Sequence, residues 1–302
     1  MRIGVIGLGA IGGITAQRLL SAGLDVALAA GRHAKAIAQK FPRARVGETL
    51  PGSDLYGLIL LCVRSTEIER ALTPAVPLLQ ADGAVVCLQN GFPEEKVTPL
   101  VGPSRVLGAV IGWSASMIEP GEYLLTGNGS FTLGGTSPRL EHARHVLNNA
   151  FPVHVTRNLA GARWSKLAMN CAMSTLGAVS GLSLGQLASR RDIRSLALQI
   201  VAEVVEQAKA KHVRLEPIAG IRPDRLVRFP APLAHAAIWM AARRRPQQRT
   251  GLIARLEQGR PAGIEDLNGL IDAPLNRALT RQVHEIERGQ RRIAPENLEQ
   301  LV

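Results

Sequence analysis

The class of fold is indicated by the amino-terminal stretch Arg2-Ile3-Gly4-Val5-Ile6-Gly7-Leu8-Gly9-Ala10-Ile11-Gly12-Gly13. An apolar, β-rich run over residues 2–7 leads into three spaced glycines, and a helical pattern then continues to a stop at Gly23. In such a unit the first glycine permits a tight turn, the second lets the backbone approach a pyrophosphate, and the third lets the helix pack against the strand. The stretch therefore predicts a dinucleotide-binding loop whose cofactor contacts are Gly7, Leu8, Gly9, Ala10, Ile11 and Gly12.

The end of the second expected strand indicates which dinucleotide binds. Residues 25–30 form a β-rich run that ends at Gly31-Arg32-His33. NAD-preferring sites usually place Asp or Glu here, where it binds the ribose hydroxyls. Arg32 is instead placed to pair with a 2′-phosphate, so we predict NADPH as the cofactor. The alternative is an ordinary surface arginine after a strand.

Two further apolar runs predict central strands of a parallel sheet. Residues 58–63 are continuously apolar, as expected of a strand covered on both faces, and Arg64 follows them. Residues 84–88 lead into Gln89-Asn90-Gly91. Because ligands of open α/β sheets bind beyond the carboxyl ends of the strands, we expect Arg64 and Asn90 to face the cofactor crevice. Residues 106–113 and 123–133 are predicted to be strands that extend the same sheet.

From about residue 161 the pattern changes to long helical runs, chiefly 163–180 and 192–212. The predicted fold is α/β, with an amino-terminal Rossmann-type doubly wound sheet followed by an all-α carboxy-terminal domain. We place the cofactor-binding domain at residues 1–160 and the helical substrate domain at residues 161–302.

Lys166 is the most informative residue of the helical part. Lysine is rare here, since only six of the 36 basic residues are Lys, yet Lys166 stands in an apolar helical stretch four residues before Asn170. That spacing puts the ammonium and the amide on one face of the helix. An ammonium can release its proton at moderate cost, whereas a guanidinium cannot. Lys166 is therefore a candidate acid. The alternative is that Lys166 belongs to a polar seam between the domains, in which its hydrogen bonds are satisfied by neighbouring groups.

Composition excludes several classes of protein. The net charge is +12, but aromatic residues make up only 3% and the arginines are spread along the whole chain, so we expect no nucleic-acid partner. No run of about 18 apolar residues could span a bilayer, so we expect no membrane partner. The three cysteines and seven histidines show no ligand spacing, so we expect no metal. A strand-like run at the amino terminus in place of a signal peptide predicts a cytoplasmic protein.

Taken in order, these motifs resemble the ketopantoate reductase family, NADPH-dependent enzymes that reduce a 2-keto acid to a 2-hydroxy acid. The resemblance covers nearly the whole chain. Besides the glycine loop, Arg64 and the turn at 89–91, it includes Trp164-x-Lys166-Leu167-x-x-Asn170, Gly259-Arg260, Ile264-Glu265, Asn268-Gly269 and Ile293-x-Pro295-x-Asn297-Leu298. It implies that Lys166 donates a proton to the substrate carbonyl and that Asn170 and Ser174 contact the substrate. It also implies that Asn90 bridges nicotinamide and substrate.

The sequence departs from the family pattern in the segment before Asn268. The family's Thr-Glu pair is replaced by Ala262-Gly263, and its substrate-binding serine falls at Gly251. Its Gln-Asp pair falls at Ala254-Arg255. We expect the hydride chemistry to persist with a changed substrate, and Glu265 or Arg255 to join a reshaped pocket. The alternative is that both side chains face solvent.

The leading hypothesis is an NADPH-dependent reductase of a 2-keto acid. A β-hydroxyacid dehydrogenase is a second hypothesis, because those related enzymes also place lysine four residues before asparagine. A non-catalytic NADPH-binding regulator is a third, motivated by the missing Glu and Ser. The sequence allows a homodimer but determines neither the oligomeric state nor the natural substrate.

Overall fold

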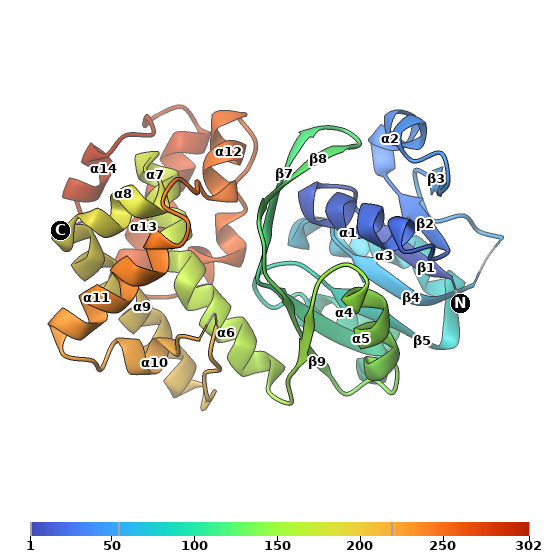
Figure 1. Cartoon of the computed structure of the whole chain (residues 1–302), viewed down its shortest axis with the longest axis horizontal. Helices are drawn as coiled ribbons and strands as arrows, with labels where there is room; N and C mark the ends of the chain where they lie inside the picture. Colours follow the sequence, from blue (N-terminus) through green and yellow to red (C-terminus); the bar gives the residue numbers. More distant parts are fainter. Residues whose placement is uncertain (1, 54, 219, 302) are drawn as a thin grey trace. The chain divides into compact units, whose positions relative to one another are not determined.

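The computed structural model places the amino-terminal apolar run in a buried strand, β1 (Ile3–Ile6), which is followed by α1 (Ala10–Ser21). The structure describes residues 2–53, 55–218 and 220–301. The chain divides into two units, Met1–Leu159 and Ala160–Val302, drawn in blue to green and in yellow to red in Figure 1.

The first unit is built on a mostly parallel sheet. Among its described residues, the strand order is β10-β9-β6-β5-β4-β1-β2-β3, and only the β6–β9 pair is antiparallel. The remaining strands are β2 (Val26–Ala29), β3 (Arg45–Gly47), β4 (Tyr56–Leu61), β5 (Leu79–Cys87), β6 (Val106–Ile111), β9 (Phe131–Gly135) and β10 (Val153–Val155). The remaining helices are α2 (Ala34–Lys40), α3 (Ile68–Leu72), α4 (Glu94–Val101) and α5 (Leu140–Asn148).

The central strands are buried on both faces. In β4, Leu58 and Leu60 belong to the apolar core that includes α1 and α5, whereas Ile59 and Leu61 belong to the core that includes α3 and α4. This division follows from the two-residue period of a strand, which sends neighbouring side chains to opposite faces. Full burial of one such side chain contributes about 1.5–3 kcal/mol, which is why the strand needs an uninterrupted apolar run. The predicted α/β fold with a doubly wound sheet is confirmed.

The expectation that residues 123–133 extend this sheet is only partly right. β8 (Glu122–Gly127) pairs with β7 (Ser114–Glu119) in a separate two-stranded antiparallel sheet. Its residues alternate between exposed and half-buried, so it lacks the two buried faces that a central strand requires. β9 does join the main sheet, but it runs antiparallel to β6.

The second unit is helical in its described part. The helix that begins in α6 (Leu159–Met169) continues through a π-turn at Asn170–Ser174 into α7 (Thr175–Ser180). The other helices are α8 (Leu184–Ser189), α9 (Arg191–Ala210), α10 (Pro223–Leu226), α11 (Ala231–Arg243), α12 (Gly251–Glu257), α13 (Pro274–Glu287) and α14 (Glu296–Glu299).

The long helix α9 shows why this unit is stable. Its buried residues are spaced three and four apart and so form one apolar stripe, made of Ile193, Leu196, Ala197, Ile200, Val201, Val204, Val205 and Ala208. Helices α8, α10, α11 and α13 and the π-turn pack against α9. Prolines begin α10 and α13, because the missing N–H of a proline costs nothing in the first turn of a helix.

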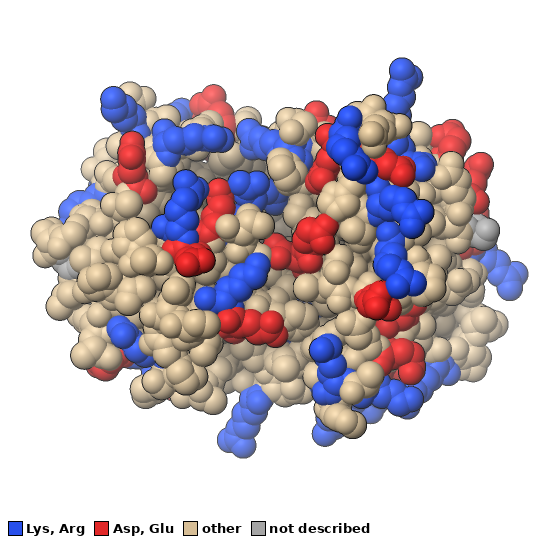
Figure 2. All heavy atoms as spheres, turned by 180° about the vertical axis from the view of Figure 1, so that it is seen from behind, with Lys and Arg blue, Asp and Glu red and all other residues tan. Residues whose placement is uncertain are grey.

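Charged side chains are mixed on the surface. In the face shown in Figure 2, Lys and Arg are scattered, and Asp and Glu lie among them. On this face the basic side chains do not form a continuous stripe. No helix of the described residues is both long enough and apolar enough to cross a membrane.

Candidate functional site

The glycine loop after β1 has the geometry that a dinucleotide requires. Gly7 has φ +96°, and a Cβ atom there would lie 2.7 Å from the Val63 nitrogen. A Cβ atom at Gly12 would lie 2.0 Å from the Gly7 carbonyl oxygen, so the helix can approach the strand only without a side chain. At Gly9, by contrast, no atom lies within 4 Å of the point that a Cβ atom would occupy. Gly9 also precedes α1 and provides no side-chain cap, so the first N–H groups of the helix can bind a phosphate.

Tyr123 anchors this loop, and sequence reasoning did not find it. Its hydroxyl donates to the Leu8 carbonyl at 2.9 Å. Its ring covers α1 so closely that a Cβ atom at Gly13 would lie 2.1 Å from it. Burial raises the pKa of Tyr123 to about 12, so the hydroxyl keeps its proton and remains a donor. The second glycine of the Gly12-Gly13 pair indicates a close neighbour on the helix, but nothing in the sequence identifies that neighbour.

The two predicted cofactor arginines lie at the same edge of the sheet as the loop. β2 and β4 flank β1 and run parallel to it, so Arg32 and Arg64 follow the strands on either side of the loop. Arg32 is exposed, and its Nε donates to His33 at 3.0 Å. Arg64 pairs with Glu67 at 3.0 Å, and this hydrogen bond raises the pKa of Arg64. Of the two arginines, Arg32 therefore has more of its positive charge available to a phosphate group.

Asn90 follows the next strand along the same edge. β5 pairs in parallel with β4, and the exposed Asn90 lies just beyond its carboxyl end. Gly91 has φ +70°, a left-handed conformation that favours glycine and turns the chain sharply after Asn90. The first unit thus brings the loop, Arg32, Arg64 and Asn90 to the carboxyl ends of four adjacent strands, and these residues fit a bound dinucleotide.

Lys166 lies in α6 of the second unit and is half-buried between buried neighbours. Burial, and in second place the positive charge of Arg245, lower the pKa of Lys166 from its ordinary value. Both effects disfavour the charged form, so the ammonium gives up its proton more readily than a surface lysine does. A readily released proton is what a general acid requires.

Asn170 and Ser174 continue the face that Lys166 begins. Asn170 is 9% exposed, and its Oδ1 accepts a hydrogen bond from Ser174 Oγ at 3.3 Å. Thr250 lies behind this face, because its hydroxyl donates to the Ser174 carbonyl at 3.2 Å. The structure therefore brings Asn170 and Ser174 together, and it places the altered segment next to Ser174.

The two departures from the family pattern differ in kind. At Gly251 no atom lies within 4 Å of the point that a Cβ atom would occupy, so a serine would fit there without strain. At Gly263 the backbone is left-handed, with φ +79°, which a glutamate adopts only at a cost. The first departure is the loss of a side chain, whereas the second also involves the backbone.

Glu265 has a partner of its own. Its Oε1 lies 2.6 Å from His284 Nε2, and Glu287 lies 3.1 Å from the other ring nitrogen. Burial lowers the pKa of His284, but the hydrogen bonds that its ring makes to the Glu287 and Glu265 carboxylates outweigh burial and raise that pKa. Glu287 also accepts from the Ala262 N–H at 2.7 Å and so holds the altered segment. A substrate contact by Glu265 remains a prediction.

Comparison with known proteins covers both units. The family model described as ketopantoate reductase PanE/ApbA matches residues 3–138, and the model of the carboxy-terminal part of that family matches residues 158–287. A 2-dehydropantoate 2-reductase of Pyrococcus horikoshii is 30% identical over 220 residues, which span 67% of this chain and 72% of that protein.

Solved structures agree with these matches. A PanE/ApbA family ketopantoate reductase from Ralstonia eutropha has a TM-score of 0.79 at 25% identity, covering 96% of this chain and 99% of the other. D-mandelate dehydrogenase, solved with NADH and anilino(oxo)acetate, has a TM-score of 0.80 at 20% identity with the same coverage of 96% and 99%. The second likeness shows the fold alone.

Proposed function

Because the chain belongs to the ketopantoate reductase family and is an NADP-dependent oxidoreductase acting on a carbonyl group, we propose that it reduces a 2-keto acid with Lys166 as the proton donor. The product is the corresponding 2-hydroxy acid. The matches to ketopantoate reductases in both units favour this activity over a β-hydroxyacid dehydrogenase or a non-catalytic regulator.

The half-buried Lys166 is the observation that carries the proposal. Burial and Arg245 lower its pKa, and Asn170 lies four residues further along the same helix. When bound, NADPH supplies the hydride that reduces the carbonyl carbon. Lys166 donates a proton to the carbonyl oxygen, and before that transfer its charge stabilises the developing alkoxide. Asn170 and Ser174 bind and orient the substrate, and an ordered substrate needs no costly reorganisation when the proton moves.

The residues of the first unit would bind the cofactor. The open position at Gly9 and the uncapped start of α1 suit a pyrophosphate, and Arg32 suits a 2′-phosphate. Arg64 would add to the positive potential at the adenosine end, and Asn90 would contact the nicotinamide and the substrate. The order of the strands supports these roles, because it sets all four groups along one edge.

The substrate is proposed to differ from ketopantoate in the part that the family's serine and glutamate recognise. Gly251 and Gly263 offer no side chain at those two positions. A missing hydrogen bond to a charged group costs about 1.5–3 kcal/mol, so two such losses weaken discrimination for ketopantoate by orders of magnitude. Glu265 and Arg255 remain the proposed substitutes in this part of the pocket.

NADPH oxidation against a panel of 2-keto acids tests the function. The panel should include ketopantoate, smaller aliphatic keto acids and aromatic keto acids, with 3-hydroxy acids and NADP⁺ in a reverse assay. We expect turnover with at least one 2-keto acid and none with the 3-hydroxy acids. Tight NADPH binding without oxidation by any 2-keto acid would favour the regulator instead.

We also propose that the enzyme is a homodimer and acts in the cytoplasm, where NADPH is the common reductant. Helix α11 supports the first point, because Leu233, Trp239 and Met240 expose large apolar side chains on it. Light scattering should give twice the chain mass of 32.3 kDa. Fractionation of the source cells tests the location.

A further inference from the structure

The π-turn in the helix that carries Lys166 leaves one buried carbonyl in need of a donor. The Thr175 N–H donates to the carbonyls of Ala172 and Asn170. In a regular α-helix its partner would be Cys171, four residues back. Cys171 is fully buried, so water cannot serve its carbonyl, and an unpaired carbonyl there would be costly. The π-turn thus takes from the buried Cys171 carbonyl its usual partner, and a donor from outside the helix can take its place.

Asn268 supplies that donor. Its Nδ2 donates to the Cys171 carbonyl at 3.0 Å, and its Oδ1 accepts from Thr175 Oγ1 at 2.6 Å. Asn268 and Thr175 are both 0% exposed, so water does not compete for these hydrogen bonds. One side-chain amide thus binds a carbonyl inside the π-turn and the hydroxyl immediately after it.

A carboxylate determines which way this amide faces. The Nδ2 of Asn268 also donates to Asn276 Oδ1 at 2.9 Å, and Asn276 Nδ2 donates to Glu203 Oε2 at 2.7 Å. An ionised carboxylate only accepts hydrogen bonds, so Glu203 directs the N–H groups of Asn276 toward itself. The Asn276 oxygen then faces Asn268, whose N–H groups face Asn276 and Cys171. The Asn268 oxygen is left facing Thr175.

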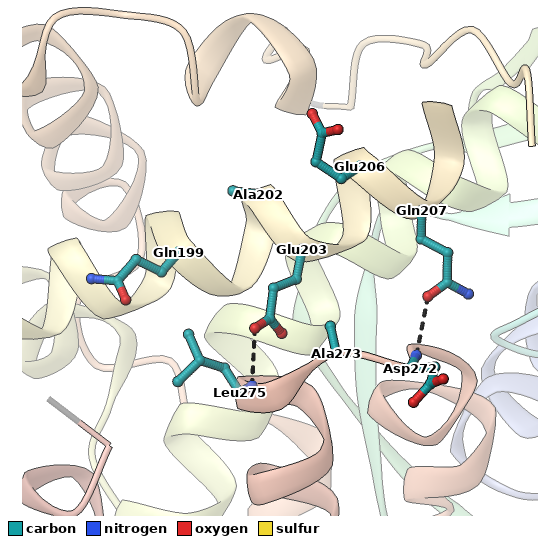
Figure 3. A pocket seen from close by; sticks show the side chains of 8 residues that line it. All are labelled: Gln199, Ala202, Glu203, Glu206, Gln207, Asp272, Ala273 and Leu275. Atoms are coloured by element: carbon teal, nitrogen blue, oxygen red, sulfur yellow. Dashed lines mark hydrogen bonds between the residues drawn. The ribbon is translucent and has the colours of Figure 1, made fainter. Parts of the chain in front are cut away.

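Glu203 is itself held at the wall of an open cavity, which Figure 3 shows from close by. It accepts from the backbone N–H groups of Leu275 and Asn276, each at 3.0 Å, in the first turn of α13. Nearby, Gln207 Oε1 accepts from the Asp272 N–H at 3.0 Å. These hydrogen bonds hold the start of α13, from which Asn276 reaches Asn268.

We propose that Asn268 is a positioning residue for the reduction, because it holds the π-turn that sets Asn170 and Ser174 relative to Lys166. The inference rests on the proposed function, since it takes this helix face to be the one that binds the keto acid. The contact between Ser174 Oγ and Asn170 Oδ1 spans the π-turn. A relaxation to regular α-helix would shift the register by one residue and rotate everything after the turn by about 100°. Ser174 would then stay one regular turn from Asn170, but it would point about 80° away from Lys166.

The test compares two buried asparagines that both donate to carbonyls. Asn268→Asp keeps the shape of the side chain but replaces the donor nitrogen with oxygen. Asn297→Asp is the matched control, because Asn297 is also buried and its Nδ2 donates to the Val179 and Arg292 carbonyls, beyond the π-turn. Each variant is measured for kcat and KM with the best 2-keto acid, for NADPH affinity and for its thermal midpoint.

We expect Asn268→Asp to lower kcat by about tenfold to a hundredfold, as small misplacements at a reacting centre do, with NADPH affinity unchanged. Asn297→Asp should leave kcat near that of the parent, whatever its thermal midpoint, because Arg291 donates to Asn297 Oδ1 at 2.8 Å and would face the new carboxylate. Adding Asn170→Ala to Asn268→Asp should cost little more, because both changes act on one group. Equal kcat losses in the two Asp variants, or fully additive effects with Asn170→Ala, would overturn the inference.

A milder variant covers the case in which Asn268→Asp does not fold. Thr175→Val removes the hydroxyl that donates to Asn268 Oδ1 and, at 3.4 Å, to the Asn170 carbonyl. It should lower kcat severalfold and speed amide exchange at residues 170–175. Unchanged kcat and unchanged exchange would overturn the inference. If the parent protein shows no NADPH oxidation with any 2-keto acid, the proposed function has failed. This outcome is distinct from that of an active parent that tolerates both Asn268→Asp and Thr175→Val.

Discussion

Replacing Lys166 with Met should remove most of the turnover and leave the fold intact. The Met side chain keeps an unbranched apolar stem in the half-buried site but cannot donate a proton. Removal of a general acid typically slows a reaction by about 10²–10⁴-fold. At about 1.36 kcal/mol for each factor of ten, the lost transition-state stabilisation is about 3–5 kcal/mol.

The same substitution should not reduce stability, and the sign follows from the pKa. Burial and Arg245 lower the pKa of folded Lys166, whereas the unfolded chain titrates near the ordinary value of 10.5. Below the folded pKa both states carry the ammonium, and the folded state bears the full cost of holding it. This cost disappears as the pH rises from the folded to the unfolded pKa. At neutral pH the thermal midpoint of Lys166→Met should therefore equal or exceed that of the parent.

The assay is kcat as a function of pH, with NADPH and the keto acid saturating. Since the protonated lysine is the donor, kcat of the parent should fall as the pH rises through the lowered pKa of Lys166. Arg245→Gln removes a like charge, so it should raise the pKa of Lys166 and move this fall to higher pH. Lys209→Met is the control, since that lysine is exposed and lies 3.7 Å from Glu206. Parent-like kcat in Lys166→Met would refute the assignment of Lys166 as proton donor.

Four other substitutions test the cofactor and substrate positions. Arg32→Ser should weaken NADPH binding by about tenfold or more and leave NADH binding unchanged, because the lost contact is to the 2′-phosphate; equal losses in fluorescence titrations would contradict this. Tyr123→Phe removes the hydrogen bond to the Leu8 carbonyl, so the KM for NADPH should rise by about threefold to tenfold while kcat at saturation persists; an unchanged KM would show that the hydroxyl does not hold the loop. Gly251→Ser should fold like the parent and raise kcat/KM for ketopantoate. Gly263→Glu should lower the free energy of unfolding by about 1–2 kcal/mol, because the backbone there is left-handed. Thermal unfolding and ketopantoate kinetics test both variants, and a Gly251→Ser variant less stable than Gly263→Glu would contradict this reasoning.

Sequence patterns identify the buried strands but not all of their partners. A parallel strand with two buried faces needs an uninterrupted apolar run, and the run at 58–63 accordingly overlaps β4, which spans Tyr56–Leu61. The residues of β8 are equally β-prone, but β-propensity does not specify a pairing partner. Their pairing with β7 in a separate sheet depends on a register that only the folded chain defines.

The same limit applies to the candidate site. Lys166 and Asn170 can be found from their spacing of four, because helix geometry converts that spacing into a shared face. The π-turn cannot be found in this way, since it changes a hydrogen bond and not the apolar pattern of residues 163–180. Asn268 stands in a recognisable motif, but its partners Thr175 and Cys171 lie 93 and 97 residues away in the chain. Contacts of that range follow from the tertiary fold and leave no local signal.

Deuterium transfer is the most direct test of the central claim. The protein would be incubated with NADPH that carries deuterium at the transferable C4 position and with the best 2-keto acid of the panel, and the product would be analysed by mass spectrometry and NMR. We expect the parent to form a 2-hydroxy acid with one deuterium at C2, and we expect Lys166→Met to form much less of it. A product without the label at C2, or equal labelled product from Lys166→Met, would contradict it.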